Sequence, residues 1–334
     1  MKKNKPQMKL IKLSLAFLLF LFSEKIIAQD TTKIVAQDTA NLMSQLENES
    51  GENKIIYTTS TFKYTRINNG HSVENLPARV LDVRISHRFG PLSRGVYQFF
   101  GLDASSFNVR IGFDYGITNN FMIGIGHNAW QKTYDGFFKL KILRQSTGAV
   151  KMPFSVSFVP TFALATIKAK DFGYVHTDTT ANEKDRFSYV LQLLIARKFS
   201  EGFSLQLMPT FIHADNTSFD HYRNGEFERD IWALGVGATQ KISKRMSINV
   251  EYYYQLPETQ ATASTNVFSF GIDLGTGGHV FQLDFTNSFG LTEKSFISEV
   301  AKHGDGSGLR FGFNISRVFQ LGKKHNGNSA WKKN

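Results

Sequence analysis

Hydrophobic and polar residues alternate with a period of two through most of residues 80–321. Between residues 109 and 113, for example, Val109, Ile111 and Phe113 alternate with Arg110 and Gly112. This is the period of a β-strand, in which successive side chains point to opposite faces of the sheet. Twelve stretches follow the pattern, at lengths close to the roughly 9–11 residues that a tilted membrane-spanning strand needs. They are residues 80–89, 107–118, 121–131, 137–145, 154–167, 187–199, 204–214, 231–242, 247–256, 267–274, 279–289 and 309–321.

The connections between these predicted strands alternate between short and long. The short turns are residues 119–120, 200–203, 243–246 and 275–278, and the longer connections are 90–106, 168–186, 215–230, 257–266 and 290–308. Two connections, 132–136 and 146–153, fit this rhythm less well. Bacterial membrane barrels have short periplasmic turns and longer external loops. The sequence therefore predicts an all-β fold, a transmembrane antiparallel up-and-down β-barrel of about twelve strands, with about ten or fourteen as alternatives.

A soluble periplasmic β-sandwich would show the same alternation. The membrane barrel is favoured by the 31 phenylalanines, by charged residues on several polar faces and by the difference in loop length. In a membrane barrel the apolar face meets lipid, the polar face lines the lumen, and closure leaves no unpaired backbone in the lipid. Pro160 and Pro209 interrupt two predicted strands, and each is expected to sit at a β-bulge because proline cannot donate to the ladder.

The N-terminus has the organisation of a secretory signal peptide. Lysines from Lys2 to Lys12 precede an apolar run over residues 13–22, and Ala28 is a small residue suited to cleavage. A membrane-anchoring helix is the alternative, but the apolar run is much shorter than the roughly 20 residues that a bilayer requires. We therefore expect residues 1–28 to be a signal peptide and the mature protein to lie in the cell outer membrane.

The rest of the chain divides into four predicted regions. Residues 29–54 are polar and are expected to be a disordered periplasmic linker. Residues 55–78 form an N-terminal segment that is strand-like at 55–66 and turn-like at 67–76. This segment either enters the lumen as a partial plug or packs on the periplasmic mouth of the barrel. Residues 79–321 form the barrel, and residues 322–334 form a basic tail.

Charge and cysteine content exclude several classes of function. Most of the formal net charge of +11 comes from the two ends of the chain, so the body is close to neutral and gives no argument for nucleic-acid binding. The absence of cysteine excludes disulfides, lipid attachment to cysteine and thiolate metal sites. We expect no cofactor, no metal site and no nucleic-acid partner. The expected partners are outer-membrane lipid and, during insertion, the barrel-assembly machinery, and the protein is expected to be a monomer.

The alternation places eleven charged residues at inward-facing positions. Cations dominate the first, second, fourth and twelfth predicted strands, and anions dominate the ninth to eleventh. This sorting could set a transverse field across a narrow pore, in which case neutralising Arg84, Arg110 and Lys139 together would shift ion selectivity toward cations. Alternatively, the charges pair with one another and fill a small barrel. The candidate lumen-lining residues are Asp82, Arg84, Arg88, Arg110, Asp114, Lys139, Lys141, Glu251, Asp273, Asp284 and Arg310.

Five motifs are long enough to be specific. They are residues 69–74 (NGHSVE), 85–90 (ISHRFG), 251–254 (EYYY), 276–283 (TGGHVFQL) and 311–319 (FGFNISRVF). Over roughly residues 61–321 the chain resembles an uncharacterised family of Gram-negative outer-membrane β-barrels, a domain of unknown function. The resemblance implies an outer-membrane barrel and implies no reaction, so no catalytic residue can be transferred from it.

A narrow or plugged channel for small solutes is the function that we expect from these features. The alternative is a non-transporting structural or surface-binding barrel that uses its external loops, including the aromatic residues Tyr97, Phe99 and Phe100.

A membrane-surface hydrolase is a third possibility. His213, Asp215, Asp220 and His221 gather near the outer end of one predicted strand, where an Asp–His pair could activate water or hold a metal. Their spacing matches no metal motif and no strong nucleophile accompanies them. We therefore expect the protein not to be an enzyme.

Overall fold

The computed structural model describes residues 54–167, 186–214, 222–223, 226–227, 230–257, 264–303 and 307–322. The predicted signal peptide, nearly all of the predicted linker and the tail after Gly322 lie outside the described residues. The chain divides into two compact units, Met1–Lys54 and Ile55–Asn334, and the second unit contains the barrel.

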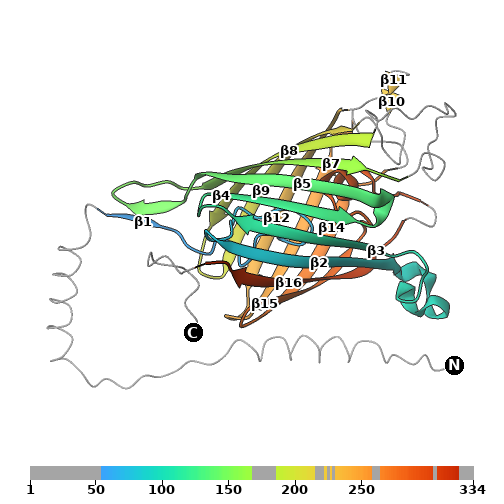
Figure 1. Cartoon of the computed structure of the whole chain (residues 1–334), viewed down its shortest axis with the longest axis horizontal. Coiled ribbons are helices and arrows are strands. Elements are labelled where there is room, and N and C mark those ends of the chain that lie inside the picture. The colour runs from blue at the N-terminus through green and yellow to red at the C-terminus, as the bar shows by residue number, and fades with distance from the viewer. Residues whose placement is uncertain are drawn as a thin grey trace, which may run out of the picture. The chain divides into compact units, whose positions relative to one another are not determined.

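In the described residues, twelve antiparallel strands close into a barrel (Figure 1). Barrel strands that are consecutive along the chain are neighbours in the wall, and the last strand, β16, pairs with the first, β2, to close the ring. The predicted fold class is confirmed, and each predicted strand overlaps one observed strand. The barrel strands are β2 (Val80–Pro91), β3 (Asn108–Gly116), β4 (Phe121–Asn128), β5 (Thr133–Leu143), β7 (Ser155–Ala165), β8 (Phe187–Lys198), β9 (Phe203–Ala214), β12 (Asp230–Lys241), β13 (Met246–Gln255), β14 (Val267–Thr276), β15 (His279–Thr286) and β16 (Arg310–Gln320).

The outer and inner faces of the barrel wall differ in polarity. On β3, Ile111 and Phe113 face outward and are each 45% exposed, whereas Arg110 and Asp114 face inward and are buried. An apolar outer surface is what a barrel presents to lipid.

One sector of the inner face is apolar. On β8, β9 and β12 it carries Val190, Leu194, Met208, Ile212 and Ile231, all buried in one cluster with residues from outside the barrel wall. The expected polar lining therefore does not hold in this sector. The reason is that these side chains meet apolar side chains of residues 62–76 and 296–300, and not water.

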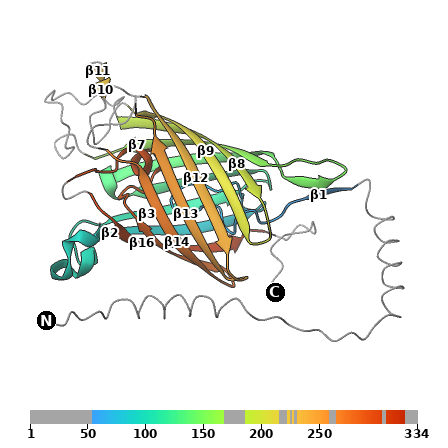
Figure 2. The ribbon, with the colours of Figure 1, turned by 180° about the vertical axis from the view of Figure 1, so that it is seen from behind.

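The short turns lie at one end of the barrel and the long connections at the other. The residues before β2 and after β16 meet at the short-turn end, where the Leu321 N–H donates to the Arg79 carbonyl over 2.8 Å. Seen from behind, the short strand β1 (Ile55–Tyr57) lies at this end, and β10 (Tyr222–Arg223) and β11 (Glu226–Phe227) lie at the other (Figure 2).

Few elements lie outside the barrel wall. The strand predicted over residues 55–66 is shorter in the structure, where only β1 is a strand, because the chain then turns into the lumen. β1 pairs with β6 (Ser146–Gly148). The described helices are η2 (Leu92–Arg94), η3 (Val96–Gly101), η4 (Trp130–Lys132) and α3 (Glu293–Ser298). None of these described helices has the length and apolar character needed to cross a bilayer.

The prediction of β-bulges at the two prolines is wrong. Pro160 pairs with Leu191 and Pro209 pairs with Leu234, in ladders that keep their register. The register shifts in the described barrel ladders lie at Lys141/Leu143 and Arg310/Gly312. A proline removes one donor from a ladder, and here that loss does not require an additional residue in the strand.

Candidate functional site

Residues 61–76, which we call the lumen segment, enter the barrel from its short-turn end and fold back on themselves. The Ile67 N–H donates to the Gly70 carbonyl over 2.9 Å, and the Ser72 N–H donates to the Thr65 carbonyl over 3.0 Å. These bonds make a tight hairpin whose tip is residues 67–70. The tip reaches inward side chains of β13, β14, β15 and β16, so the hairpin lies within the lumen.

Glu251 on β13 holds the tip of the hairpin. Its carboxylate accepts the backbone N–H groups of Asn68, Asn69 and Gly70 over 3.2, 2.8 and 2.8 Å. Three successive N–H groups that point at one anion form an anion-binding concavity. A side chain is excluded at Gly70, because a Cβ atom there would lie 2.4 Å from the Glu251 carboxylate and 2.2 Å from the Tyr253 hydroxyl.

Glycines in the barrel wall make room for the hairpin. A Cβ atom at Gly237 would lie 2.4 Å from the Ile67 side chain, and one at Gly271 would lie 2.2 Å from the Asn68 side chain. Both glycines lie on inward faces, so the wall is shaped to the segment it contains.

Lys139 on β5 binds both arms of the hairpin. Its ammonium group, fully buried, donates to the carbonyls of Thr65, Ser72 and Glu74 over 3.1, 3.0 and 2.9 Å. On β9, the Gln206 side chain accepts the Val73 N–H and donates to the His71 carbonyl, each over 2.7 Å. Wall side chains thus supply many of the polar contacts that the segment makes.

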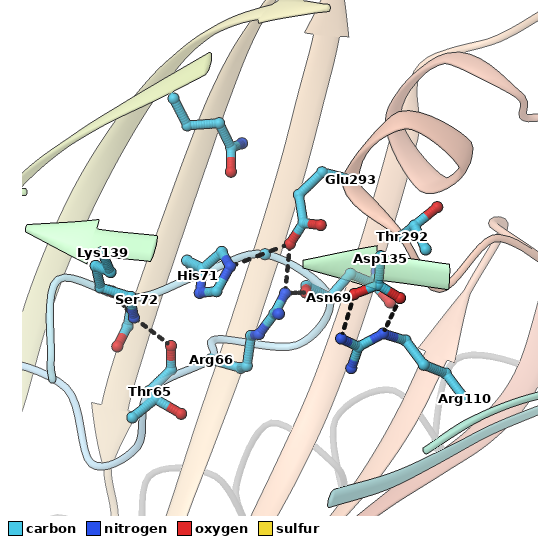
Figure 3. Close-up of polar contacts among 12 residues, drawn as sticks. Thr65, Arg66, Asn69, His71, Ser72, Arg110, Asp135, Lys139, Thr292 and Glu293 are labelled. Carbon is cyan, nitrogen blue, oxygen red and sulfur yellow. Dashed lines mark hydrogen bonds and ion pairs between the residues drawn. The ribbon is translucent and has the colours of Figure 1, made fainter. Parts of the chain in front are cut away.

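The connection between β15 and β16 closes the lumen from the long-loop end. Its helix α3 is wholly buried, and Phe296 packs edge-on against Tyr253 with ring centroids 5.5 Å apart. The Gln255 side chain donates to the Ile297 carbonyl over 2.7 Å. Glu293, at the start of α3, accepts from Arg66 of the lumen segment over 2.5 Å (Figure 3).

His71 lies beside this ion pair, with its Nε2 atom 3.3 Å from the Glu293 carboxylate. Its ring meets Phe137 edge-on at 4.4 Å between centroids. Burial, together with the charges of Arg66, Lys139, Arg110 and Arg84, holds the pKa of His71 well below its usual value. The His71 ring therefore binds a proton less readily here than a solvated histidine does.

Two small cavities lie in the described part of the lumen. Their volumes are about 20 Å³ next to the hairpin tip and about 10 Å³ next to α3. A volume of this size holds on the order of one water molecule. In this conformation neither cavity admits a solute.

A family model, described as a membrane bound beta barrel domain (DUF5777), matches residues 62–319. The chain belongs to this family. The resemblance found in the sequence motifs is thereby confirmed at the level of the family. The match over residues 62–319 takes in nearly all of the lumen segment of this DUF5777 barrel and nearly all of its wall.

Solved structures similar to this DUF5777 barrel include porins and an outer membrane channel. NanC porin has 10% identity and a TM-score of 0.44, covering 71% of this chain and 98% of its own. KdgM porin has 10% identity and a TM-score of 0.43, covering 72% and 99%. The COG4313 outer membrane channel from Pseudomonas putida F1 has 12% identity and a TM-score of 0.43, covering 74% and 98%. No curated protein matches the chain, and similarities this low transfer no function.

The structure places the eleven predicted lumen-lining residues of the DUF5777 barrel on its inner side. Ten are buried, and Lys141 is partly exposed, with its ammonium 3.6 Å from the Glu74 carboxylate. Two ion pairs form among these residues: Arg84 with Asp82 at 3.1 Å and Arg88 with Asp284 at 3.2 Å.

Two further predicted residues have partners outside the predicted set. Asp273 accepts from Ser247 and Gln282 over 2.9 and 2.7 Å. Arg310 lies apart from the hairpin tip, donates to the Phe89 carbonyl and stacks over Phe289. The charges therefore do not form one continuous ladder around an open pore.

Several residues of the site escaped prediction. Asp135, which pairs with Arg110 through two hydrogen bonds of 2.9 and 2.5 Å, falls in the predicted connection 132–136, whereas β5 begins at Thr133. Arg66, His71 and Glu293 lie outside barrel strands, where alternation carries no information. The polar turn INNG at residues 67–70 was the available signal for the hairpin tip.

The hydrolase constellation is described only at His213. Its Nδ1 atom lies 2.6 Å from the Asp230 carboxylate at the outer ends of β9 and β12. Asp215, Asp220 and His221 lie outside the described residues. Within the described part of the chain, no group of three or more His, Asp or Glu side chains is arranged to hold a metal ion.

Proposed function

We propose that this protein is an outer-membrane channel for small solutes whose lumen is closed, in this conformation, by the lumen segment. The observation that carries the proposal is that residues of one hairpin, and not the wall charges alone, fill the centre of the barrel. The hairpin enters at the short-turn end, which the proposal places in the periplasm because bacterial barrels have their short turns there.

The way in which the segment is held supports a removable plug. Most of its described polar contacts are hydrogen bonds to side chains such as Glu251, Lys139 and Gln206, and it adds no strand to the barrel. Because the barrel closes without it, the segment could leave while every wall strand kept its neighbours. The charged wall groups would then be solvated by water in the opened lumen.

A non-transporting structural barrel is the second candidate. It is favoured by the apolar contacts of Phe62, Ile67 and Val73, which are buried in one cluster with wall residues of β8 and β9. Removing the hairpin would expose this apolar sector to water, which opposes opening.

Single-channel conductance in a planar lipid bilayer separates the two candidates. The proteins to compare are the chain from residue 29, the same chain lacking residues 29–54, and the same chain lacking residues 29–78. Each must first be shown to be folded by its β-rich circular dichroism and its heat-dependent mobility on a gel. The proposal expects stable ohmic steps only after deletion to residue 78, while the shorter deletion is the matched control that keeps the hairpin. Silence from all three folded proteins would favour the structural barrel.

The protein would be exported by residues 1–28, inserted by the barrel-assembly machinery and surrounded as a monomer by outer-membrane lipid. The exposed outward residues of the wall, such as Ile111 and Phe113, supply the apolar surface that lipid contact requires.

A further inference from the structure

A small cavity lies between the lumen segment and the wall formed by β2 and β3. Its volume is about 20 Å³. Four arginines contribute to its lining, and none of the described residues that line it is acidic. The lining residues are Arg66, Asn68, Asn69, Arg84, Ser86, Arg88, Arg110, Leu291 and Asn314.

Each of the four arginines has a carboxylate partner, and none of those partners lines the cavity. The pairs are Arg66 with Glu293 at 2.5 Å, Arg84 with Asp82 at 3.1 Å, Arg88 with Asp284 at 3.2 Å and Arg110 with Asp135 at 2.5 Å. Figure 3 shows Arg66 and Arg110 reaching their carboxylates on opposite sides of Asn69. The acids thus balance the arginines from outside the cavity, which itself is lined by cationic and neutral groups.

Among the side chains that line the cavity, three donors lack a partner in the described part of the chain: Nε of Arg84, Nε of Arg88 and Nδ2 of Asn68. One acceptor, Oδ1 of Asn68, also lacks a partner there, and all three side chains are more than nine-tenths buried. Buried polar groups in folded proteins almost always have a hydrogen-bond partner. Unpartnered donors outnumber unpartnered acceptors three to one in this lining, which points to a bound acceptor.

We propose that this cavity binds a single monoatomic anion of the size of chloride. Arginine side chains have donors only, so the lining favours a species that accepts hydrogen bonds from several directions. The volume holds on the order of one water-sized particle, which favours a halide over phosphate or an organic acid. This inference does not depend on whether the barrel conducts solutes.

The anion would join the lumen segment to the barrel wall. Arg66, Asn68 and Asn69 belong to the hairpin, whereas Arg84, Arg88 and Arg110 belong to β2 and β3. A ligand shared by both sides stabilises the state in which the hairpin is docked. Small anions are therefore expected to hold the hairpin in place.

Ser86 on β2 offers a sharp test, because its side chain lines the cavity and is 7% exposed. The variant Ser86→Asp would supply a carboxylate in place of the bound anion. The variant Ser86→Asn has nearly the same size without the charge and is the matched control.

The experiment follows thermal unfolding of the full chain in detergent while sodium chloride replaces sodium gluconate at constant ionic strength. We expect the wild type and Ser86→Asn to gain a saturable increase in Tm on the order of a few degrees, and Ser86→Asp to show none. Equal chloride dependence in the two variants, or no chloride dependence in the wild type, would overturn the proposal.

Crystals of the wild-type protein grown in sodium bromide provide a test that does not depend on either variant. An anomalous bromide peak within hydrogen-bond distance of the Arg84 and Arg88 Nε atoms is expected. A cavity that holds only water under these conditions would overturn the proposal.

Discussion

Arg66 and Glu293 form an ion pair inside the barrel, with 2.5 Å between the guanidinium and the carboxylate. Arg66 lies on the hairpin that enters from the short-turn end, and Glu293 begins the helix that enters from the long-loop end. The pair therefore joins the two elements that close the lumen. Both side chains are buried, at 7% and 2% exposure, so water and salt weaken the attraction between the two charges very little.

Breaking this pair is expected to destabilise the closed lumen. Removing one partner of a buried ion pair leaves an uncompensated charge, which typically costs about 3–5 kcal/mol. The variants Glu293→Gln and Arg66→Gln should each lower the free energy of unfolding in urea by roughly this amount. The double variant should lose much less than the sum of the two, because the charges are coupled. Additive losses would show that the residues do not act as a pair.

Glu251 is expected to control the order of the hairpin tip. Glu251→Gln removes the charge that accepts three backbone N–H groups, and charge-assisted hydrogen bonds contribute about 1.5–3 kcal/mol each. Amide hydrogen exchange of residues 68–70 should accelerate at least tenfold, while exchange in the wall strands stays the same. Asp230→Asn on β12 is the control, because it also removes a wall carboxylate and Asp230 contacts His213 on the neighbouring strand. Equal acceleration in both variants would argue against an anchoring role for Glu251.

Substitution at Gly70 is expected to displace the hairpin. Gly70→Ala would place a methyl group 2.2 Å from the Tyr253 hydroxyl, and overpacking of this kind costs roughly 1–3 kcal/mol. Gly277→Ala is the matched control, since a Cβ atom at that turn would meet nothing within 4 Å. Denaturant unfolding and protease sensitivity of residues 61–76 should change only in Gly70→Ala. An unaffected Gly70→Ala would mean that the tip is not held as tightly as this contact implies.

Acidification is expected to loosen the hairpin through His71. The pKa of His71 is lowered in the docked state by burial and by Arg66, Arg84, Arg110 and Lys139, whereas a solvated histidine has a pKa near 6.5. The released state therefore takes up a proton below about pH 6.5 that the docked state does not. The free energy of docking falls with decreasing pH, by at most about 1.4 kcal/mol per pH unit.

Hydrogen exchange of residues 61–76 between pH 8 and pH 5, corrected for intrinsic rates, measures this dependence. His71→Gln should remove it. The other charged group that contacts His71 is Glu293, and its attraction for a protonated ring would act in the opposite direction. The same pH dependence in the wild type and in His71→Gln would show that His71 does not cause the loosening.

The strands of the barrel wall could be predicted from the sequence because each strand is recognised from the alternation of its own residues. Each strand must place apolar side chains toward lipid, so alternation at residues such as Ile111 and Phe113 reports the strand without reference to the rest of the chain. The alternation of short and long connections then indicates the antiparallel up-and-down order of the strands. Strand periodicity did not predict the apolar inner face at Leu194 and Met208, because there the wall meets protein and not water.

The contents of the lumen depended on tertiary structure alone. Nothing in the neighbourhood of Glu251 indicates that its carboxylate binds the backbone of residues 68–70, which lie more than 180 positions earlier in the chain. The sequence by itself determined a membrane barrel with charges at inward positions. Only the folded chain decided which of those charges pair, which hold the hairpin and which line a cavity. The physical reason is that strand periodicity follows from contacts between each residue and its immediate surroundings, whereas the partners of a lumen charge follow from closure of the whole ring.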